Sequence, residues 1–248
     1  MTLIAIGSVR GAPGVTTLTV ALAAVWDRVG AEPLVVEADP DGGVLAARFS
    51  LGHQPSLTQL GARARATLDD SAVWDAAQLL PGGLPVVVAH PAADQGHATL
   101  RTAGGRIAEH LAALPGHDVL VDVGRVRPGS PASPIIDRAA LVLVVLRPRV
   151  DEVDAAVHRL AAVAEHGNVG IVVVGGRRRD AEDVEGALGL PVLGVIAHDT
   201  RGAGTLASTL TARGLQRLPL LRTARELART LASHLDMAVR ADAQRAAS

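Results

Sequence analysis

The residues best suited to bind an anion lie near the start of the chain, between an apolar run and a helix-like stretch. The loop from Ser8 to Thr17 contains two glycines, a proline and two threonines. Backbone N–H groups converge in such a loop, and the dipole of the following helix favours negative charge. A phosphate group could bind there, with a threonine hydroxyl as a ligand of Mg²⁺. Glycine-containing turns between strands and helices also occur for packing alone, so the loop by itself leaves both interpretations open.

The cations of this loop differ from the usual pattern. A phosphate-binding loop normally has a lysine directly before its Ser/Thr, and that lysine neutralises the β- and γ-phosphates. Here Val15 precedes Thr16, and the nearest cation is Arg10, whose planar guanidinium differs in shape from an ammonium group. All 24 basic residues of the chain are arginine, so an arginine-biased genome is a second explanation for the missing lysine. The loop predicts a phosphate site without its main cation.

Carboxylates follow two other apolar runs. Asp39 comes directly after the run 33–38, and Asp122 lies at the end of the run 118–123, just before Gly124. A carboxylate after a buried strand could orient water or support Mg²⁺. The alternatives are structural: Asp-Pro-Asp-Gly is also typical of a turn, and Asp122 could cap the segment that follows it.

These residues sit in a regular alternation of short apolar runs and helix-like stretches. Seven runs of four to eight residues are nearly continuous in apolar residues, as is typical of strands buried on both faces of a parallel sheet. They are 3–7, 33–38, 84–89, 118–123, 140–146, 169–175 and 192–197. Helices are expected over 15–29, 56–66, 96–114, 151–166, 180–188 and 221–246.

This alternation predicts the fold class. We expect an α/β, doubly wound, mostly parallel sheet of about seven strands with helices on both faces, in three layers. Residues 1–248 contain no repeat and no Pro/Ser-rich linker, so we expect one domain. The C-terminal helix is expected over about 221–246, with fraying over 240–248.

Composition excludes several classes of protein. The chain is 48% hydrophobic with a net charge of −1, so nothing global attracts nucleic acid or an acidic membrane. It has no cysteine, hence no disulfide, thiolate metal site or cysteine nucleophile. The nine histidines lack the spacing of metal ligands. Neither a signal peptide nor a transmembrane segment is indicated, and a cytoplasmic protein is expected.

Taken in order, the motifs resemble those of the MinD/ParA family, whose deviant Walker A loop reads Lys-Gly-Gly-x-Gly-Lys-Thr-Thr. Arg10 falls on the signature lysine of that motif, and Val15 replaces its phosphate-binding lysine. Glu37 and Asp39 fall on the acidic residues of the family's switch I sequence. The resemblance covers about residues 1–235. It also extends to the last two strands, where Gly175 replaces an Asn that reads adenine in ATP-binding relatives.

The resemblance assigns roles to individual residues. It implies that Asp39 orients the attacking water, if the protein is active, and that Thr16, Asp39 and Asp122 support Mg²⁺, if nucleotide binds. The residues that it implies for nucleotide binding are Arg10, Gly11, Ala12, Pro13, Gly14, Val15, Thr16, Thr17, Asp122 and Gly124. Because Val15 and Gly175 both depart from the pattern, we expect binding of ATP and Mg²⁺ to be weakened or lost.

Two functions follow from the resemblance. In the first, the chain is a divergent MinD/ParA-like protein with a degenerate nucleotide site. It acts as a dimeric positioning or scaffold protein, similar to the TadZ/CpaE group, for a pilus or secretion ATPase or another positioning protein. In the second, it is an active ATP-hydrolysing switch that uses Arg10, Thr16, Asp39 and Asp122. DNA binding is the least favoured role because the net charge is near zero.

Overall fold

The computed structural model describes residues 2–10, 13–66, 69–164, 168–206 and 215–246. Within them, eight strands form one sheet in the order β3-β4-β2-β5-β1-β6-β7-β8. All neighbouring strands are parallel except β3 and β4, which are antiparallel. The strands are β1 (Thr2–Ser8), β2 (Glu32–Glu37), β3 (Gln78–Leu79), β4 (Pro85–Val87), β5 (His117–Arg125), β6 (Leu141–Leu146), β7 (Val169–Val174) and β8 (Val192–Ile196).

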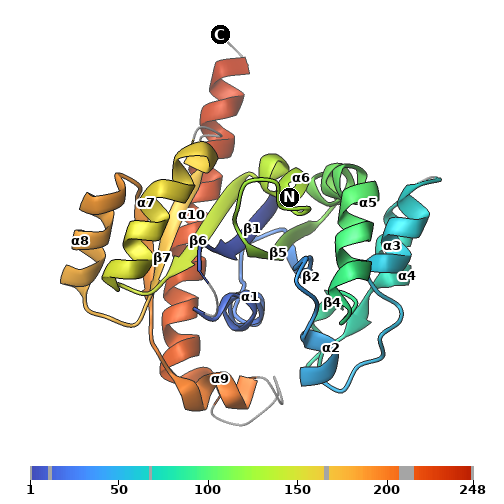
Figure 1. Ribbon diagram of the computed structural model, residues 1–248, viewed down its shortest axis with the longest axis horizontal. Coiled ribbons are helices and arrows are strands. Elements are labelled where there is room, and N and C mark those ends of the chain that lie inside the picture. The colour runs from blue at the N-terminus through green and yellow to red at the C-terminus, as the bar shows by residue number, and fades with distance from the viewer. Residues whose placement is uncertain (1, 11–12, 67–68, 165–167, 207–214, 247–248) are drawn as a thin grey trace.

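Helices cover both faces of the sheet, which gives three layers (Figure 1). One face packs against α3 (Leu57–Ala64), α4 (Asp70–Ala76), α5 (Ala93–Ala113), α6 (Ser133–Arg138), α7 (Val150–Ala164) and α8 (Arg178–Leu188). The other face packs against α1 (Val15–Ala23), α2 (Leu45–Arg48), α9 (Thr200–Leu206) and α10 (Pro219–Ala246). The 3₁₀ turn η1 (Leu215–Arg217) precedes α10. The predicted fold class is confirmed, and each apolar run that predicted a strand contains one.

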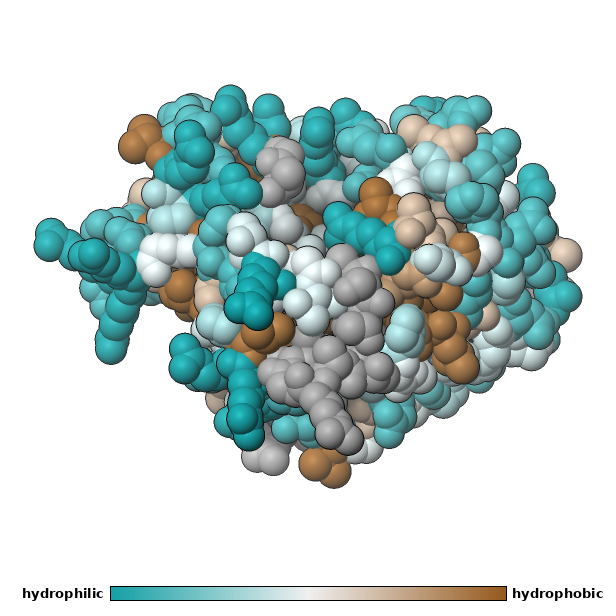
Figure 2. All heavy atoms as spheres, turned by 90° about the horizontal axis from the view of Figure 1, so that it is seen from below, coloured by the Kyte–Doolittle hydropathy of each residue, from teal (hydrophilic) through white to brown (hydrophobic). Residues whose placement is uncertain are grey.

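The carboxyl ends of the parallel strands lie along a single edge of the sheet. At this edge β1 leads into α1, β2 into α2 and β8 into α9. Figure 2 views the molecule from the side on which α2 and α9 lie in Figure 1, and hydrophilic side chains cover much of this face. In open α/β sheets, ligands bind outside the carboxyl ends of the strands, where the strand order reverses. The central strand β1 lies at such a point, between β5 and β6.

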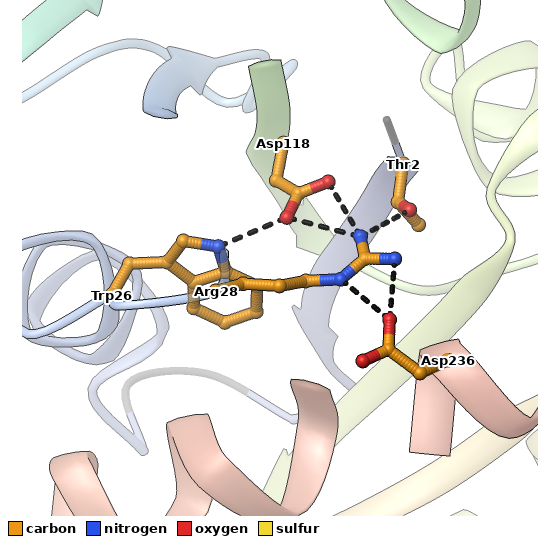
Figure 3. Close-up of polar contacts among 5 residues, drawn as sticks. All are labelled: Thr2, Trp26, Arg28, Asp118 and Asp236. Carbon is orange, nitrogen blue, oxygen red and sulfur yellow. Dashed lines mark hydrogen bonds and ion pairs between the residues drawn. The ribbon is translucent and has the colours of Figure 1, made fainter. Parts of the chain in front are cut away.

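The largest difference from the predicted elements is the end of α1. The apolar pattern predicts a helix over 15–29, but α1 ends at Ala23. The chain then turns so that Trp26 Nε1 donates to Asp118 Oδ2 at 3.0 Å, and Arg28 donates to both Asp118 oxygens and to Asp236 (Figure 3). Asp118 is fully buried, and a buried carboxylate is costly unless it is bonded. This requirement overrides the helical pattern.

Other differences involve short elements and chain ends. The strand β3 and the helices α2, α4, α6 and α9 are too short to give a clear periodic signal and were not predicted. The helix α10 continues to Ala246 and extends beyond the rest of the fold (Figure 1). Fraying over 240–248 stays a prediction. Residues 247–248 lie outside the described part of the chain. None of the described helices combines the length and the apolar character that crossing a bilayer requires.

Candidate functional site

The loop after β1 places a glycine at the start of α1. Gly14 is the N-cap residue, with φ 98° and ψ 32°, and its carbonyl accepts the Leu18 N–H at 2.8 Å. This left-handed backbone conformation is one that L side chains rarely adopt, which explains a glycine there. The next residues, Val15, Thr16 and Thr17, form the first turn of the helix. The predicted site residues Gly11 and Ala12 lie outside the described residues.

Three segments meet at a cavity of about 340 Å³ at the carboxyl edge of the sheet. The first turn of α1 contributes Gly14 to Thr17, the end of β2 and the following loop contribute Glu37 and Asp39, and β5 contributes Asp122 and Gly124. The structure therefore brings together seven residues that the sequence singles out. They are Gly14, Val15, Thr16, Thr17, Asp39, Asp122 and Gly124.

A short hydrogen bond at the cavity joins α1 to β5. The Thr16 hydroxyl donates to Asp122 Oδ2 at 2.6 Å, and the other oxygen of Asp122 accepts the Gly124 N–H at 2.9 Å. Burial, with a smaller contribution from the nearby carboxylates of Asp39 and Glu37, raises the pKa of Asp122 to about 7 against the lowering effect of the two hydrogen bonds. The protonated form of this carboxyl group is therefore favoured well above the pH at which an exposed aspartate loses its proton.

Asp39 reaches the same cavity from the loop after β2. Its Oδ1 atom accepts the Asp41 N–H at 2.8 Å, and its carboxylate lies directly against Gly124. Gly124 has φ 63°, and a Cβ atom there would overlap the Asp39 carboxylate, so this position requires glycine. Burial raises the pKa of Asp39 as well. The raised pKa values show that the cavity disfavours negative charge on these groups.

The arginines that line the cavity are not the one that the sequence motif indicates. Val15 is only 8% exposed and packs in the apolar cluster beneath α1, so it offers no charge to the cavity. Arg10 donates to Asp151 Oδ2 at 3.3 Å, at the start of α7, and is not among the residues that line the cavity. The arginines that do line it are Arg125 and Arg48, which donates to the Thr17 hydroxyl at 3.4 Å.

Sequence reasoning missed Arg48 because nothing in the sequence predicts the four-residue helix α2 that carries it. It also missed the contacts of Glu37, which it placed only as the first acidic residue of the switch I sequence. Glu37 is 1% exposed, and its carboxylate accepts three backbone N–H groups. A buried carboxylate marks a place where several hydrogen-bond donors meet, because burying such a group is costly without them.

A smaller cavity, of about 130 Å³, lies beside the first at the ends of β7 and β8. Pro13, Gly14 and Thr17 line it on one side, and His198 and Asp199 on the other. Asp199 is a structural cap, since its carboxylate accepts the N–H groups of Gly202 at 2.8 Å and of Leu220 at 3.3 Å. Gly175, at the position where the family resemblance expects an adenine-reading Asn, has φ 73° and no side chain.

The donor set fits Mg²⁺ better than it fits a triphosphate. The Thr16 hydroxyl and the carboxylates of Asp39 and Asp122 are hard oxygen ligands of the kind that Mg²⁺ prefers. Because Mg²⁺ keeps most of its waters and binds together with substrate phosphates, these oxygens alone do not form a complete site. Within the described residues, no group of three or more His, Asp or Glu is arranged to hold a metal ion by itself.

Comparison with known proteins identifies the fold. The sequence matches no protein-family model and none of the curated proteins. Among solved structures, a ParA family ATPase from Chlorobium tepidum has a TM-score of 0.74 at 16% identity, covering 90% of this chain and 96% of that one.

Two further structures give the same result. The septum site-determining protein MinD from Pyrococcus horikoshii, solved with Mg-ADP, has a TM-score of 0.70 at 17% identity, with 91% and 93% covered. The ATP complex of a Cyanothece McdA variant has a TM-score of 0.68 at 14% identity, with 93% and 96% covered. The chain therefore has the fold of the MinD/ParA P-loop ATPases, as its motifs had predicted.

Proposed function

We propose that the chain is a MinD/ParA-type positioning or scaffold protein that binds Mg-ATP weakly or not at all and does not depend on hydrolysis. The names of similar structures support the first part, because they include ParA, MinD and McdA proteins. Two of these were solved with Mg-ADP or ATP. Coverage above 90% of each of these chains supports a comparison of the whole fold, the nucleotide cavity included.

The observation that carries the proposal is the buried position of Val15. At the residue where a lysine would neutralise phosphate, an apolar side chain packs into the core. The pKa values of Glu37, Asp39 and Asp122 are all raised, with burial as the largest cause, and none of these three groups offers positive charge to a phosphate. A charge-assisted hydrogen bond to phosphate is worth roughly 1.5–3 kcal/mol. Its loss in such a cavity favours weak binding.

The second cavity supports the same conclusion. Its volume of about 130 Å³ is below the roughly 300 Å³ at which ligand pockets usually begin. Gly175 provides no side-chain group that could read a base. A nucleotide would have to gain affinity from backbone groups and from Arg48 and Arg125, which line the larger cavity.

One observation favours the alternative, an active ATPase. The Thr16–Asp122 hydrogen bond of 2.6 Å joins two groups to which the family resemblance assigns Mg²⁺, and Asp39 lies at the same cavity. In that function Arg48 or Arg125, together with Arg10 after a change of its present contact, would supply the phosphate charge. The two functions make opposite predictions for the affinity of the unmodified protein.

The same proposal includes partners and location. We expect a homodimer that recruits a protein partner, such as a secretion or pilus ATPase or another positioning protein, as in the TadZ/CpaE group that the sequence resembles. The protein would be cytoplasmic and recruited to a membrane-associated assembly. A DNA-binding role stays the least favoured, because a net charge of −1 gives no overall attraction to nucleic acid.

Calorimetric titration with Mg-ATP tests the proposal. We expect no binding at sub-micromolar affinity for the unmodified chain, and binding at least about tenfold tighter for Val15→Lys, which restores roughly 1.4 kcal/mol or more. Val29→Lys is the matched control, since Val29 is 98% exposed and adds the same charge away from the cavity. Sub-micromolar binding by the unmodified protein would refute the proposal. No gain in Val15→Lys would place the main defect elsewhere in the cavity.

A further inference from the structure

Glu37 is a buried carboxylate that joins two separate loops at the candidate site. Its Oε1 atom accepts the backbone N–H groups of Val44 at 2.7 Å and Leu45 at 3.0 Å. Its Oε2 atom accepts the N–H of Ala89, just beyond β4, at 3.0 Å. The loop after β2 is thereby connected to the loop after β4 through one side chain.

Two glycines allow the loops to approach this closely. A Cβ atom on Gly43 would lie 2.5 Å from Glu37 Oε2 and 2.6 Å from the Ala89 carbonyl oxygen, and one on Gly42 would lie 2.6 Å from the Pro91 carbonyl oxygen. The Gly43 N–H also donates to the His90 carbonyl at 3.1 Å. Any larger residue would separate the loops and break the bonds of Glu37.

These bonds set the place of the whole segment 39–48. Its start is held by the Ala38 N–H, which donates to the Asp122 carbonyl at 2.8 Å. Its middle is held by Glu37, which accepts the N–H groups of Val44 and Leu45 at the start of α2. N–H groups at a helix start have no acceptor within the helix itself. Asp39 and Arg48, two of the side chains that the segment presents to the cavity, are therefore both placed by this arrangement.

We propose that Glu37 is a positioning residue that holds segment 39–48 in one conformation, with Asp39 and Arg48 facing the cavity, whether or not the cavity is occupied. This goes beyond the proposed function and rests on it in one respect: a surface that does not change with nucleotide suits a scaffold. A carboxylate is needed because one oxygen bonds two donors and the other bonds a third. The length of glutamate is needed because aspartate is one methylene shorter.

Hydrogen exchange in solution tests the proposal without a ligand. We expect amides in segments 39–48 and 86–92 to exchange about tenfold faster or more in Glu37→Gln and Glu37→Asp, as one or two hydrogen bonds are lost. Exchange in α10 and β5 should stay unchanged. Glu32→Gln is the matched control, because Glu32 lies on the same strand and is exposed. A rise spread evenly over the chain, or no rise in segment 39–48, would overturn the proposal.

A second pair of variants tests the same contact without changing Glu37. Gly43→Ala should speed exchange in the same two segments, because its Cβ atom displaces the carboxylate from Ala89. Gly105→Ala in α5 is the control, since a Cβ atom there meets nothing within 4 Å. Unchanged exchange in Gly43→Ala would refute the close approach on which the proposal stands.

A final measurement separates this proposal from the proposed function. Exchange of the unmodified protein is recorded with and without millimolar Mg-ATP, beside the calorimetric titration. If nucleotide alters exchange in segment 39–48, the proposal for Glu37 fails, whatever the affinity. If nucleotide binds tightly and exchange there stays the same, the proposed function fails and the role of Glu37 stands.

Discussion

The Thr16 hydroxyl donates to the buried carboxylate of Asp122 at 2.6 Å and so links the first turn of α1 to the end of β5. Both groups are oxygen donors suited to Mg²⁺, and each occupies part of the bonding capacity of the other. The link joins two of the segments that line the cavity. It also leaves the protonation of Asp122 sensitive to pH near neutrality, because burial raises its pKa to about 7.

The raised pKa of Asp122 predicts that the protein loses stability as the pH rises. The unfolded chain releases this proton near its ordinary pKa of 3.8, whereas the folded chain holds it up to about 7. Between these values the folded state binds more protons, so rising pH favours unfolding, by up to on the order of 4 kcal/mol over the whole interval. The unfolding free energy of the unmodified chain, measured by urea denaturation, should fall relative to that of Asp122→Asn as the pH is raised from roughly 4.5 to roughly 8.

The exposed Asp75→Asn is the control for this measurement, because it removes a carboxylate from the surface. Its difference from the unmodified protein should stay small over the same range of pH. An equally flat profile for Asp122→Asn would contradict the assignment of the raised pKa to Asp122.

The buried ion pair of Arg28 predicts a large effect on stability. The side chains of Arg28 and Asp118 are 10% and 0% exposed, and they bond at 2.9 Å. Removal of Arg28 breaks the ion pair of the buried Asp118 carboxylate, and loss of one partner of a buried pair costs about 3–5 kcal/mol. Arg28→Ala should therefore lower the unfolding free energy by about that amount in urea denaturation.

Arg63→Ala is the matched control, because Arg63 pairs with Asp75 at 3.1 Å while both side chains are more than half exposed. Loss of such a surface pair costs about 0–1 kcal/mol. Equal effects of the two substitutions would contradict the burial of the Arg28 pair.

Gly124 should tolerate alanine less well than a glycine with similar backbone geometry. Gly124 has φ 63° and Gly129 has φ 71°, but only at Gly124 would a Cβ atom overlap the Asp39 carboxylate. Both substitutions carry the cost of a left-handed conformation, roughly 1 kcal/mol. Gly124→Ala should cost more, measured as unfolding free energy, because Asp39 must move. A cost no greater than that of Gly129→Ala would mean that Asp39 does not rest on Gly124 in solution.

Asp39→Ala distinguishes the two proposed functions by turnover. For a protein without an effective nucleotide site, phosphate release from Mg-ATP should be at background and unaffected by the substitution. Asp75→Ala serves as a control for loss of a carboxylate elsewhere. Turnover comparable to that of active ATPases, abolished by Asp39→Ala alone, would establish the active switch instead.

Much of the fold could be predicted because it depends on local patterns. Continuous apolar runs predict the seven parallel strands, since strands buried on both faces need apolar side chains at every position. The two-residue strand β3 has no such pattern. The end of α1 could not be predicted either, because it depends on Asp118, about ninety residues away, as the partner of Trp26 and Arg28.

The candidate site divides in the same way. Thr16, Asp39, Asp122 and Gly124 were predicted together because the family resemblance assigns them to one site. They lie near the carboxyl ends of β1, β2 and β5, which share an edge of the sheet. The position of Arg48 depends on α2, which tertiary contacts rather than helix propensity stabilise. The pairing of Arg10 with Asp151 depends on how α7 packs, and no local pattern contains that information.

The network around Arg28 has a consequence for how the chain folds during synthesis. Arg28 bonds to Thr2 on the first strand, to Asp118 near the middle of the chain and to Asp236 on the last helix. These partners leave the ribosome at very different times, because more than two hundred residues separate Thr2 from Asp236. The network therefore closes only after α10 has left the ribosome, and a chain that stops before α10 leaves the apolar residues of α1 and β8 exposed to chaperones and proteases.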